Sequence, residues 1–172
     1  MPIRKAVSKL VPARPFDLPV IKHWLIQSDI RRWWGSPIGT HCEMRLGIVC
    51  HQDIGQIFLI LDTKNKPIGL VSMIHATALA SSRVGWPKFL PPDAWEIGIL
   101  IAQRSNRQRG IGTASLLEAQ KIVAKHSKDP VFAWIEKDNA ASLATVARLG
   151  YRRVFEHETA SYSSAVWQYT PE

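Results

Sequence analysis

Short apolar runs alternate with segments of helical period along the second half of the chain. Residues 95–102 form a β-rich apolar run that one glutamate interrupts, and residues 113–126 carry an apolar stripe at helical spacing. Further strands are expected at residues 131–135, 151–157 and 163–169, and a further helix at residues 139–149 with Gly150 as its C-terminal cap. This alternation predicts an α/β domain with a mixed sheet.

The first half begins with two expected helices. Asp17 is placed to cap a helix over residues 18–27. A second, short helix is expected over residues 28–34, ending at Gly35. Both segments precede the first of the expected strands.

A hairpin follows the two helices. The apolar runs at residues 56–61 and 68–75 flank a turn-rich segment, which predicts a pair of antiparallel strands. Residues 40–55 favour no element. Residues 80–93 are rich in proline and glycine, so an irregular loop beside a site is expected there.

Composition indicates an ordinary globular chain. At 172 residues with 46% hydrophobic content, residues 1–172 are expected to form one domain. No apolar run approaches the roughly 20 residues that span a bilayer, and no signal sequence follows the N-terminus, so a cytoplasmic protein is expected. The two cysteines stand in His41-Cys42 and Cys50-His51, whose spacing matches no usual zinc motif, and no metal is expected.

The net charge of +8 attracts anions and leaves three interpretations open. Nucleic acid is one candidate partner, although no RNA-binding motif is present. A cofactor with several phosphates is the second, and a basic soluble surface is the third. The charge alone does not choose among them.

The clearest motif is a glycine loop between an expected strand and an expected helix. Gly110 and Gly112 allow a sharp turn that directs successive N–H groups to a ligand. These groups lie at a helix N-terminus, which favours anions, and Arg104, Arg107 and Arg109 add positive charge. The loop is therefore expected to hold a pyrophosphate, although such a turn also occurs simply to pack a chain. The Walker lysine and the three glycines of a dinucleotide fold are missing.

The loop resembles the Gln/Arg-x-x-Gly-x-Gly/Ala signature of GNAT acetyltransferases. A second resemblance begins at Asn139-x-x-Ser142 and ends in Leu149-Gly150-Tyr151. The match covers residues 94–154 well and the first 90 residues in outline. It implies a mixed, mostly antiparallel sheet of about six to seven strands flanked by helices. It also implies acetyl-CoA as the cofactor, bound by Leu100, Ile101, Ala102, Arg107, Gln108, Arg109, Gly110, Ile111, Gly112, Thr113 and Asn139.

The same resemblance implies catalytic positions. Family members with a carboxylate base place it fourteen residues before the first loop glycine, which is Glu96 here. An alkylammonium with a pKa of about 10 must lose a proton before it attacks a thioester, so a buried carboxylate of raised pKa suits that role. A glutamate at a sheet edge or paired with an arginine is the alternative. Many members use a tyrosine as the general acid for the leaving thiolate, at the position where this chain has Val146. Ser142 therefore becomes the candidate proton donor, a pattern similar to the ribosomal-protein N-terminal acetyltransferases.

The acceptor side is expected to contain Trp33, Trp34 and Trp86, because the first helices and the loops over the sheet form it in this family. Residues 24–35 also resemble, over a short stretch, aminoglycoside 6′-N-acetyltransferases. The expected function is acetyl transfer to a primary amine of a small molecule or of a protein N-terminus. An aminoglycoside enzyme, a ribosome-associated protein and a non-catalytic CoA sensor remain alternatives, and the acceptor and a homodimer stay open.

Overall fold

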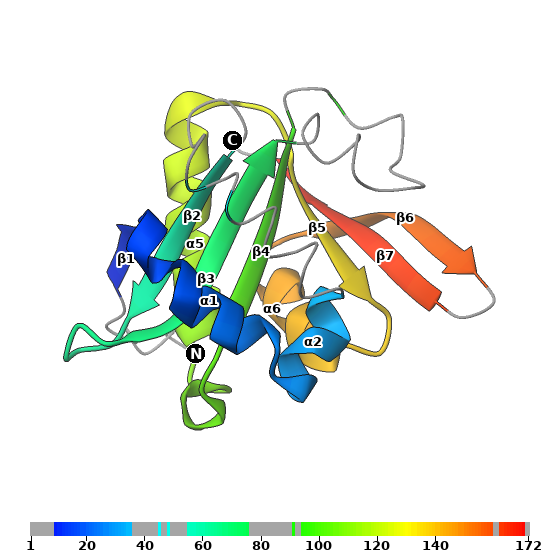
Figure 1. The fold of residues 1–172 in the computed structure, drawn as a ribbon. Helices are drawn as coiled ribbons and strands as arrows, with labels where there is room; N and C mark the ends of the chain where they lie inside the picture. The colour runs from blue at the N-terminus through cyan, green and yellow to red at the C-terminus, as the bar shows by residue number, and fades with distance from the viewer. Residues whose placement is uncertain are drawn as a thin grey trace.

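The computed structural model describes residues 9–35, 45, 48, 55–75, 91, 94–159 and 162–170. Figure 1 shows these residues as a twisted central sheet with helices on both faces. The expectations for residues 40–54 and 80–90, including the cysteine pairs and Trp86, lie outside the described residues apart from Arg45 and Ile48.

The sheet has seven strands in the order β1-β2-β3-β4-β5-β7-β6. The strands are β1 (Lys9–Pro12), β2 (Gly55–Leu61), β3 (Pro67–His75), β4 (Trp95–Ile101), β5 (Val131–Glu136), β6 (Arg152–Thr159) and β7 (Tyr162–Tyr169). Every neighbouring pair is antiparallel except β4 with β5, which is parallel. The mixed, mostly antiparallel sheet of the expected fold class is therefore confirmed.

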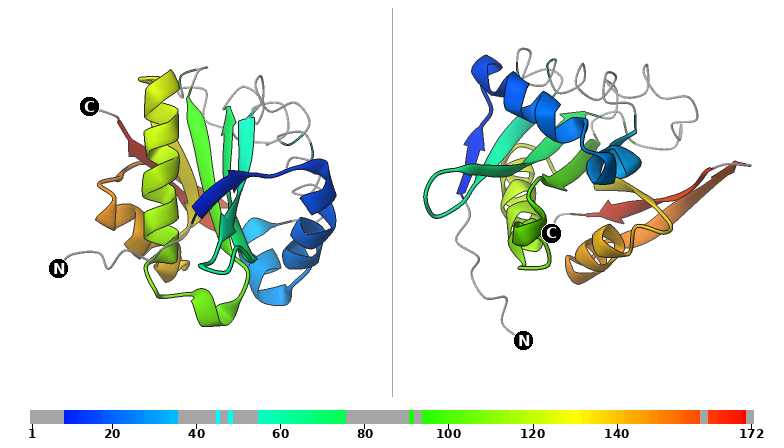
Figure 2. Two further views of the ribbon diagram at one scale, coloured as in Figure 1. Left: turned by 90° about the vertical axis from the view of Figure 1, so that its left-hand side faces the viewer. Right: turned by 60° about the horizontal axis from the view of Figure 1, so that its bottom comes forward.

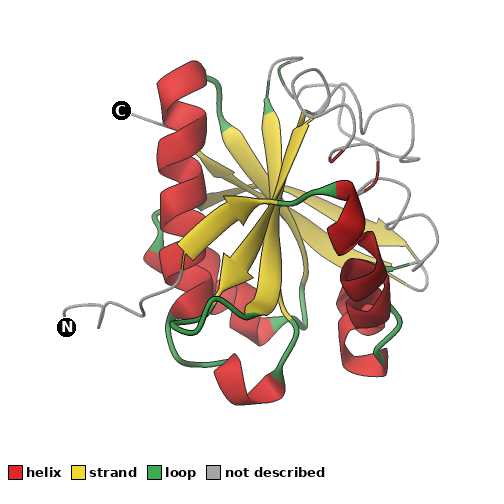
Figure 3. Cartoon of the chain, turned by 60° about the vertical axis from the view of Figure 1, so that its left-hand side comes forward, coloured by secondary structure: helices red, strands yellow, loops and turns green. Residues whose placement is uncertain are grey.

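Helices cover the two faces of the sheet separately (Figures 2 and 3). One face carries α1 (Leu18–Leu25) and α2 (Ser28–Trp34), and the other carries α5 (Ile111–His126) and α6 (Ala140–Arg148). The remaining helical segments are the 3₁₀ turns η1 (Pro15–Asp17) and η2 (Arg104–Asn106). The chain thus forms three layers, with the sheet in the middle.

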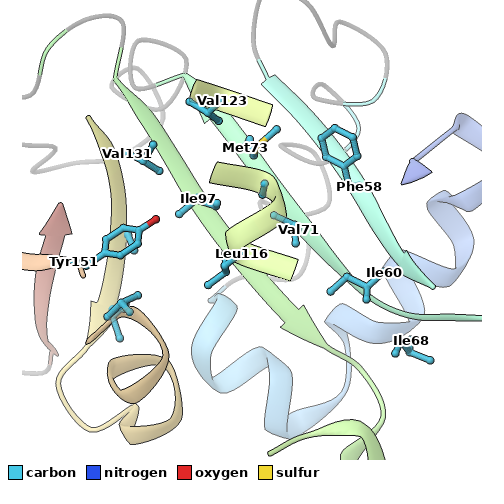
Figure 4. Close-up of a cluster of buried hydrophobic side chains, with 14 residues drawn as sticks. Phe58, Ile60, Ile68, Val71, Met73, Ile97, Leu116, Val123, Val131 and Tyr151 are labelled. Carbon is cyan, nitrogen blue, oxygen red and sulfur yellow. The ribbon is translucent and has the colours of Figure 1, made fainter. Parts of the chain in front are cut away.

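Each face of the sheet has its own core, because side chains alternate along a strand. On β4, Ile97 packs with α5 and α6 residues, whereas Leu100 packs with residues of α1 and α2. Figure 4 shows the first of these cores, with Leu116 and Val123 of α5 lying against the strands. Burial of apolar surface contributes about 25 cal/mol per Å² on each face, so β4 is held from both sides through Ile97 and Leu100.

The predicted element boundaries agree with the structure to within two residues. The hairpin is confirmed by the antiparallel register of β2 and β3, and α2 occupies the expected residues and ends at Gly35. Gly150 adopts a left-handed φ of 80° after α6, where Tyr151 N–H donates to the Val146 carbonyl and Gly150 N–H donates to that of Ala147. These two bonds form a Schellman motif, and Gly150 is the C-terminal cap residue that the sequence predicts.

Two features differ from the expectation. The edge strand β1 was not predicted, because prolines surround it and four residues carry little strand signal; its pairing with β2 creates it. Asp17 does precede α1, but its side chain makes no cap bond to that helix. Its Oδ2 accepts from Arg14 N–H at 2.8 Å, so it closes the preceding 3₁₀ turn.

Candidate functional site

The two parallel strands pair over a short stretch and then separate. β4 and β5 are in register at two positions, Trp95 with Val131 and Glu96 with Phe132. Beyond them, residues 97–101 of β4 and 133–136 of β5 face each other without pairing, and we call this region the splay. Figure 1 shows the two strands diverging there. The splay gives β4 an unpaired edge in the middle of a sheet.

Backbone groups on that edge follow from the alternation along a strand. The amide of Trp95 donates toward β5, to Pro130 O at 3.2 Å, whereas the amide of Ala102 donates toward β3, to Ile68 O at 2.8 Å. A Cβ built at Gly69 of β3 would lie 2.1 Å from the Leu100 carbonyl, so this group also faces β3. Of the three predicted backbone positions, Ile101 therefore directs its amide toward the splay.

The glycine loop lies directly after this edge and ends at the first turn of α5. Its backbone enters the left-handed region twice, at Gln108 with φ 59° and at Gly110 with φ 79°. Both Gly110 and Gly112 are partly exposed, and a Cβ at Gly110 would meet no atom within 4 Å. The space around Gly110 is thus open, in the loop that the sequence analysis expects to hold a pyrophosphate.

The N-terminus of α5 keeps its donors available. No side chain caps it, and its first turn has no acidic residue. The amides of Ile111, Gly112 and Thr113 precede the first intrahelical donor, Ala114, whose N–H donates to Gly110 O at 3.0 Å. These three amides and the positive end of the helix dipole together favour an anion.

The loop arginines are arranged differently from the expectation. Arg107 was expected to offer its guanidinium to a phosphate, but each of its three nitrogens donates within the protein. Nε donates to Ile101 O at 2.9 Å, Nη2 to Ala102 O at 3.2 Å and Nη1 to Asp29 Oδ2 at 2.7 Å. The Arg107 side chain therefore joins the end of β4 to α2. Arg109 is exposed next to Gly110 and adds positive charge there.

Asp29 receives a second arginine. Arg104 Nε donates to the same Oδ2 at 3.1 Å, although the Arg104 side chain is 77% exposed. The bond from Arg107, followed by the one from Arg104, holds the pKa of Asp29 below its usual value against the opposing effect of burial. Sequence reasoning missed Asp29, because the contact joins residues far apart in the chain.

Asn139 and Ser142 occupy the first turn of α6. Asn139 is the N-cap, and its Oδ1 accepts from the Ser142 N–H at 3.2 Å. This is the standard capping bond, and it explains the asparagine and its spacing from local structure. The Ser142 side chain is partly buried.

The position that commonly holds a tyrosine in this family belongs to the core here. Val146 is 2% exposed and packs among the residues between α5, α6 and the sheet. Tyr151 is buried in the same cluster (Figure 4), and burial raises the pKa of its hydroxyl far above the ordinary value. Neither residue is placed to exchange a proton with a substrate.

Glu96 lies at the point where the splay begins, on a central strand and not at a sheet edge. It is partly buried, and its Oε2 is shielded from solvent. By alternation it shares a face of β4 with Gly98, where a Cβ would lie 3.1 Å from Trp34 Cη2 and 2.7 Å from Ser72 Oγ. The fold therefore brings the predicted base and one predicted acceptor residue, Trp34, to the same face of the sheet.

An aromatic residue of α2 and a second acidic residue of the sheet also lie on this side. Trp33 is partly buried and carries the Arg32 guanidinium 4.5 Å from its ring centroid. Across the splay, Glu136 is partly buried at the end of β5, and burial, followed by repulsion from Asp138, raises its pKa. Trp24 instead belongs to the α1 core.

The described residues show no metal cluster or membrane helix. No three His, Cys, Asp or Glu side chains of this part of the chain are grouped to hold a metal ion. Within the same ranges, no helix has the length and apolar character needed to cross a membrane.

Comparisons with solved structures show the same fold. The aminoglycoside acetyltransferase AAC(6′)-Ib in complex with coenzyme A superposes with a TM-score of 0.77 at 20% identity, over 95% of this chain and 94% of that one. An aminoglycoside N(6′)-acetyltransferase from Legionella pneumophila gives 0.70 at 11% identity, over 95% and 91%. RimL, a ribosomal L7/L12 α-N-protein acetyltransferase in complex with coenzyme A, gives 0.73 at 16% identity, over 98% and 96%.

At the level of sequence, no curated protein matches this chain. The family model described as an acetyltransferase (GNAT) domain matches residues 9–152. That range contains both signatures, the splay and the glycine loop. The chain therefore belongs to the GNAT acetyltransferase family, an enzyme family whose acyl donor is acetyl-CoA.

Proposed function

We propose that this protein transfers the acetyl group of acetyl-CoA to a primary amine, of a small molecule or of a protein N-terminus, by direct attack in a ternary complex. One observation carries the proposal. An uncapped helix N-terminus adjoins an unpaired strand edge, and a partly buried glutamate lies where that edge begins. The helix N-terminus suits a phosphate, the strand edge suits the amide groups of a pantetheine arm, and the glutamate suits an amine.

The residues present fit acetyl-CoA. Its pyrophosphate would accept from the amides of Ile111, Gly112 and Thr113, with Gln108 and Gly110 shaping the loop and Arg109 adding charge. The edge of β4 at Ile101 offers an amide to the pantetheine arm or to the thioester carbonyl. When bound, the cofactor supplies the activated acetyl group. Arg107 contributes by holding the carbonyls of Ile101 and Ala102 in place.

Proton transfer is assigned to two residues on opposite sides of the splay. Glu96 would accept the proton of the ammonium, directly or through water, because its face of β4 also carries Trp34. Ser142 is the candidate to protonate the leaving thiolate, since Val146 has no proton to give. The backbone amide of Ile101 would stabilise negative charge on the carbonyl oxygen.

The acceptor is proposed at the level of an amine near Trp33 and Trp34. The likeness to aminoglycoside enzymes and to RimL supports two acceptor classes, antibiotics with amino groups and peptides with a free α-amino group. The charge of +8 disfavours a polycation, and we favour the peptide or a singly charged amine.

The test combines cofactor binding with turnover. Calorimetry with acetyl-CoA should show binding at micromolar concentration, and a thiol-release assay should then compare kanamycin, ribostamycin and a short peptide with a free α-amino group. Turnover of any of these amines supports acetyl transfer, and its rank order names the class. Absence of acetyl-CoA binding at millimolar concentration would remove the proposed function.

A further inference from the structure

Helix α2 lies across the splay and is tied to both of its sides. On the β4 side, Asp29 binds Arg107 and Arg104 of the glycine-containing segment between β4 and α5, which we call the cofactor loop. On the β5 side, Arg32 binds Asp138 at 2.8 Å, just before α6. Figure 1 shows α2 near the diverging ends of β4 and β5, in front of α6. The helix thus links two segments that the sheet itself leaves unpaired.

The two ties differ in strength. In the Arg32–Asp138 pair, the side chains are 63% and 62% exposed, so water screens the attraction. In the Arg107–Asp29 pair they are 32% and 24% exposed, and Arg107 is fixed by two further bonds to β4 carbonyls. A shielded pair with a fixed partner holds its geometry better than an exposed one. Of the two ion pairs, Arg107–Asp29 is therefore the one expected to hold α2 in position.

The position of α2 decides where Trp34 lies. Asp29 is in the first turn of the helix and Trp34 is its last residue, about 7.5 Å further along the axis. Trp34 reaches the face of β4 at Gly98, two residues after Glu96. A rotation of α2 about its buried Ile30 would move Trp34 away from that face.

We propose that Asp29 is a positioning residue for the acceptor: through Arg107 it fixes α2, and with it Trp34, opposite Glu96. The cofactor loop and the acceptor side thereby share one side chain, Arg107, which is bonded to both. This inference deepens the proposed function and rests on it for the identity of the acceptor side. It also explains why Arg107, an arginine of the cofactor-binding signature, donates all three of its nitrogens to groups of the protein.

The first experiment needs no substrate. Hydrogen exchange is compared for the wild type, Asp29→Asn and the matched control Asp138→Asn, which removes the exposed tie. Peptides covering residues 28–35 should exchange at least about tenfold faster in Asp29→Asn, and less than threefold faster in Asp138→Asn, with α5 unchanged in both. Unchanged exchange of residues 28–35 in Asp29→Asn would overturn the inference.

The second experiment measures the kinetic split. With an amine that the wild type acetylates, Asp29→Asn should raise the acceptor KM about tenfold or more and change the calorimetric Kd of coenzyme A less than threefold. Asp29→Glu, which keeps the charge, should recover most of the loss. Equal losses in acceptor KM and coenzyme A affinity would show that Asp29 merely supports the cofactor loop, and would overturn the inference.

These outcomes are separable from failure of the proposed function. If the wild type binds no coenzyme A, the proposed function fails, and the exchange rates alone decide whether Asp29 positions α2. If coenzyme A binds and amines react, but Asp29→Asn behaves as Asp138→Asn does, the inference fails and the function stands.

Discussion

The two sides of the splay end in helices that satisfy their first turns in opposite ways. On the β4 side, α5 begins at Gly110 with no side-chain cap and no acidic residue. On the β5 side, α6 begins at Asn139, whose side chain accepts from the Ser142 amide. The uncapped N-terminus of α5, a helix of 16 residues, keeps its amide donors for a ligand. In a capped helix, a side chain of the protein already accepts from one of those amides. This difference supports the proposal that the cofactor phosphates bind on the β4 side.

Two glutamates on the sheet face that α1 and α2 cover also differ in their position relative to the splay. Glu96 lies on β4 where pairing stops, and Glu136 lies at the far end of β5 beside Asp138. Both are partly buried and share one face, since Glu96 is in register with Phe132 and side chains alternate from there to Glu136. Glu136 is four positions after Phe132, so the Cα atoms of Phe132 and Glu136 are about 13 Å apart along the strand. Position relative to the splay, and not residue type, distinguishes their expected roles.

The largest effect is expected for Glu96→Gln. Removal of a general base lowers turnover by about 10² to 10⁴, or roughly 3–5 kcal/mol of transition-state stabilisation. The acceptor KM should change much less, because the amide keeps the shape of the side chain. Steady-state thiol release with a reactive amine measures both.

Glu136→Gln is the matched control for that prediction. It removes the other carboxylate of the same face, and kcat is expected to stay within about threefold. If the two variants lose kcat equally, the base is not specific to the β4 side. If Glu96→Gln retains full turnover, a water relay without this carboxylate performs the deprotonation.

The next effect concerns the uncapped end of α5. Gly110→Asp places a carboxylate at the N-cap, where it would satisfy the helix amides and repel a phosphate, and like charges in contact cost several kcal/mol. The Kd of acetyl-CoA should rise roughly a hundredfold, which corresponds to about 2.8 kcal/mol. Calorimetry measures this change directly.

Gly110→Asn separates charge from shape in this experiment. Asparagine tolerates the left-handed φ of 79° about as well as aspartate does, and no atom lies within 4 Å of its Cβ. Its effect on the Kd should therefore be at least tenfold smaller. Equal losses would mean that the loop needs glycine for its backbone and that phosphate repulsion plays no part.

A smaller effect is expected at the capped end of α6. Asn139→Ala should lower the free energy of unfolding by about 1 kcal/mol, because the Ser142 amide loses its acceptor, while Asn139→Ser should retain most of it. Chemical denaturation measures the stability. The Kd of acetyl-CoA should change less than twofold in both variants, and a larger rise in Asn139→Ala would return Asn139 to the cofactor-binding set.

Local patterns explain why the β4 side and α6 could be predicted so closely. Gly110, Asn139 and Gly150 each act within a few residues of their own position, through a turn or a cap. Such signals are present in the sequence itself, so the loop and the glycine cap are where the sequence analysis expected them, and the two helix starts are within two residues.

Contacts between distant segments could not be predicted in the same way. Three features depend on pairing or packing across the fold: the ion pair of Arg107 with Asp29, the contact between Trp34 and Gly98, and the formation of β1. An arginine in a phosphate signature has the same identity whether it binds a ligand or a carbonyl. The side-chain roles at the site were therefore less predictable than its backbone.

The smallest effect is expected at the strained residue of the cofactor loop. Gln108 has a φ of 59°, a conformation that costs an ordinary L-residue about 1–2 kcal/mol. Glycine avoids that cost, but it loses more backbone entropy on folding, which offsets part of the gain. Gln108→Gly should therefore raise the free energy of unfolding by about 0.5–1 kcal/mol, seen as a rise in Tm of roughly 1–4 °C. Asn65→Gly is the matched control, since Asn65 has the same φ of 59° in the β2–β3 turn but asparagine tolerates it. Its Tm should rise less, and a fall in Tm for Gln108→Gly would show that the glutamine side chain stabilises the loop before any cofactor binds.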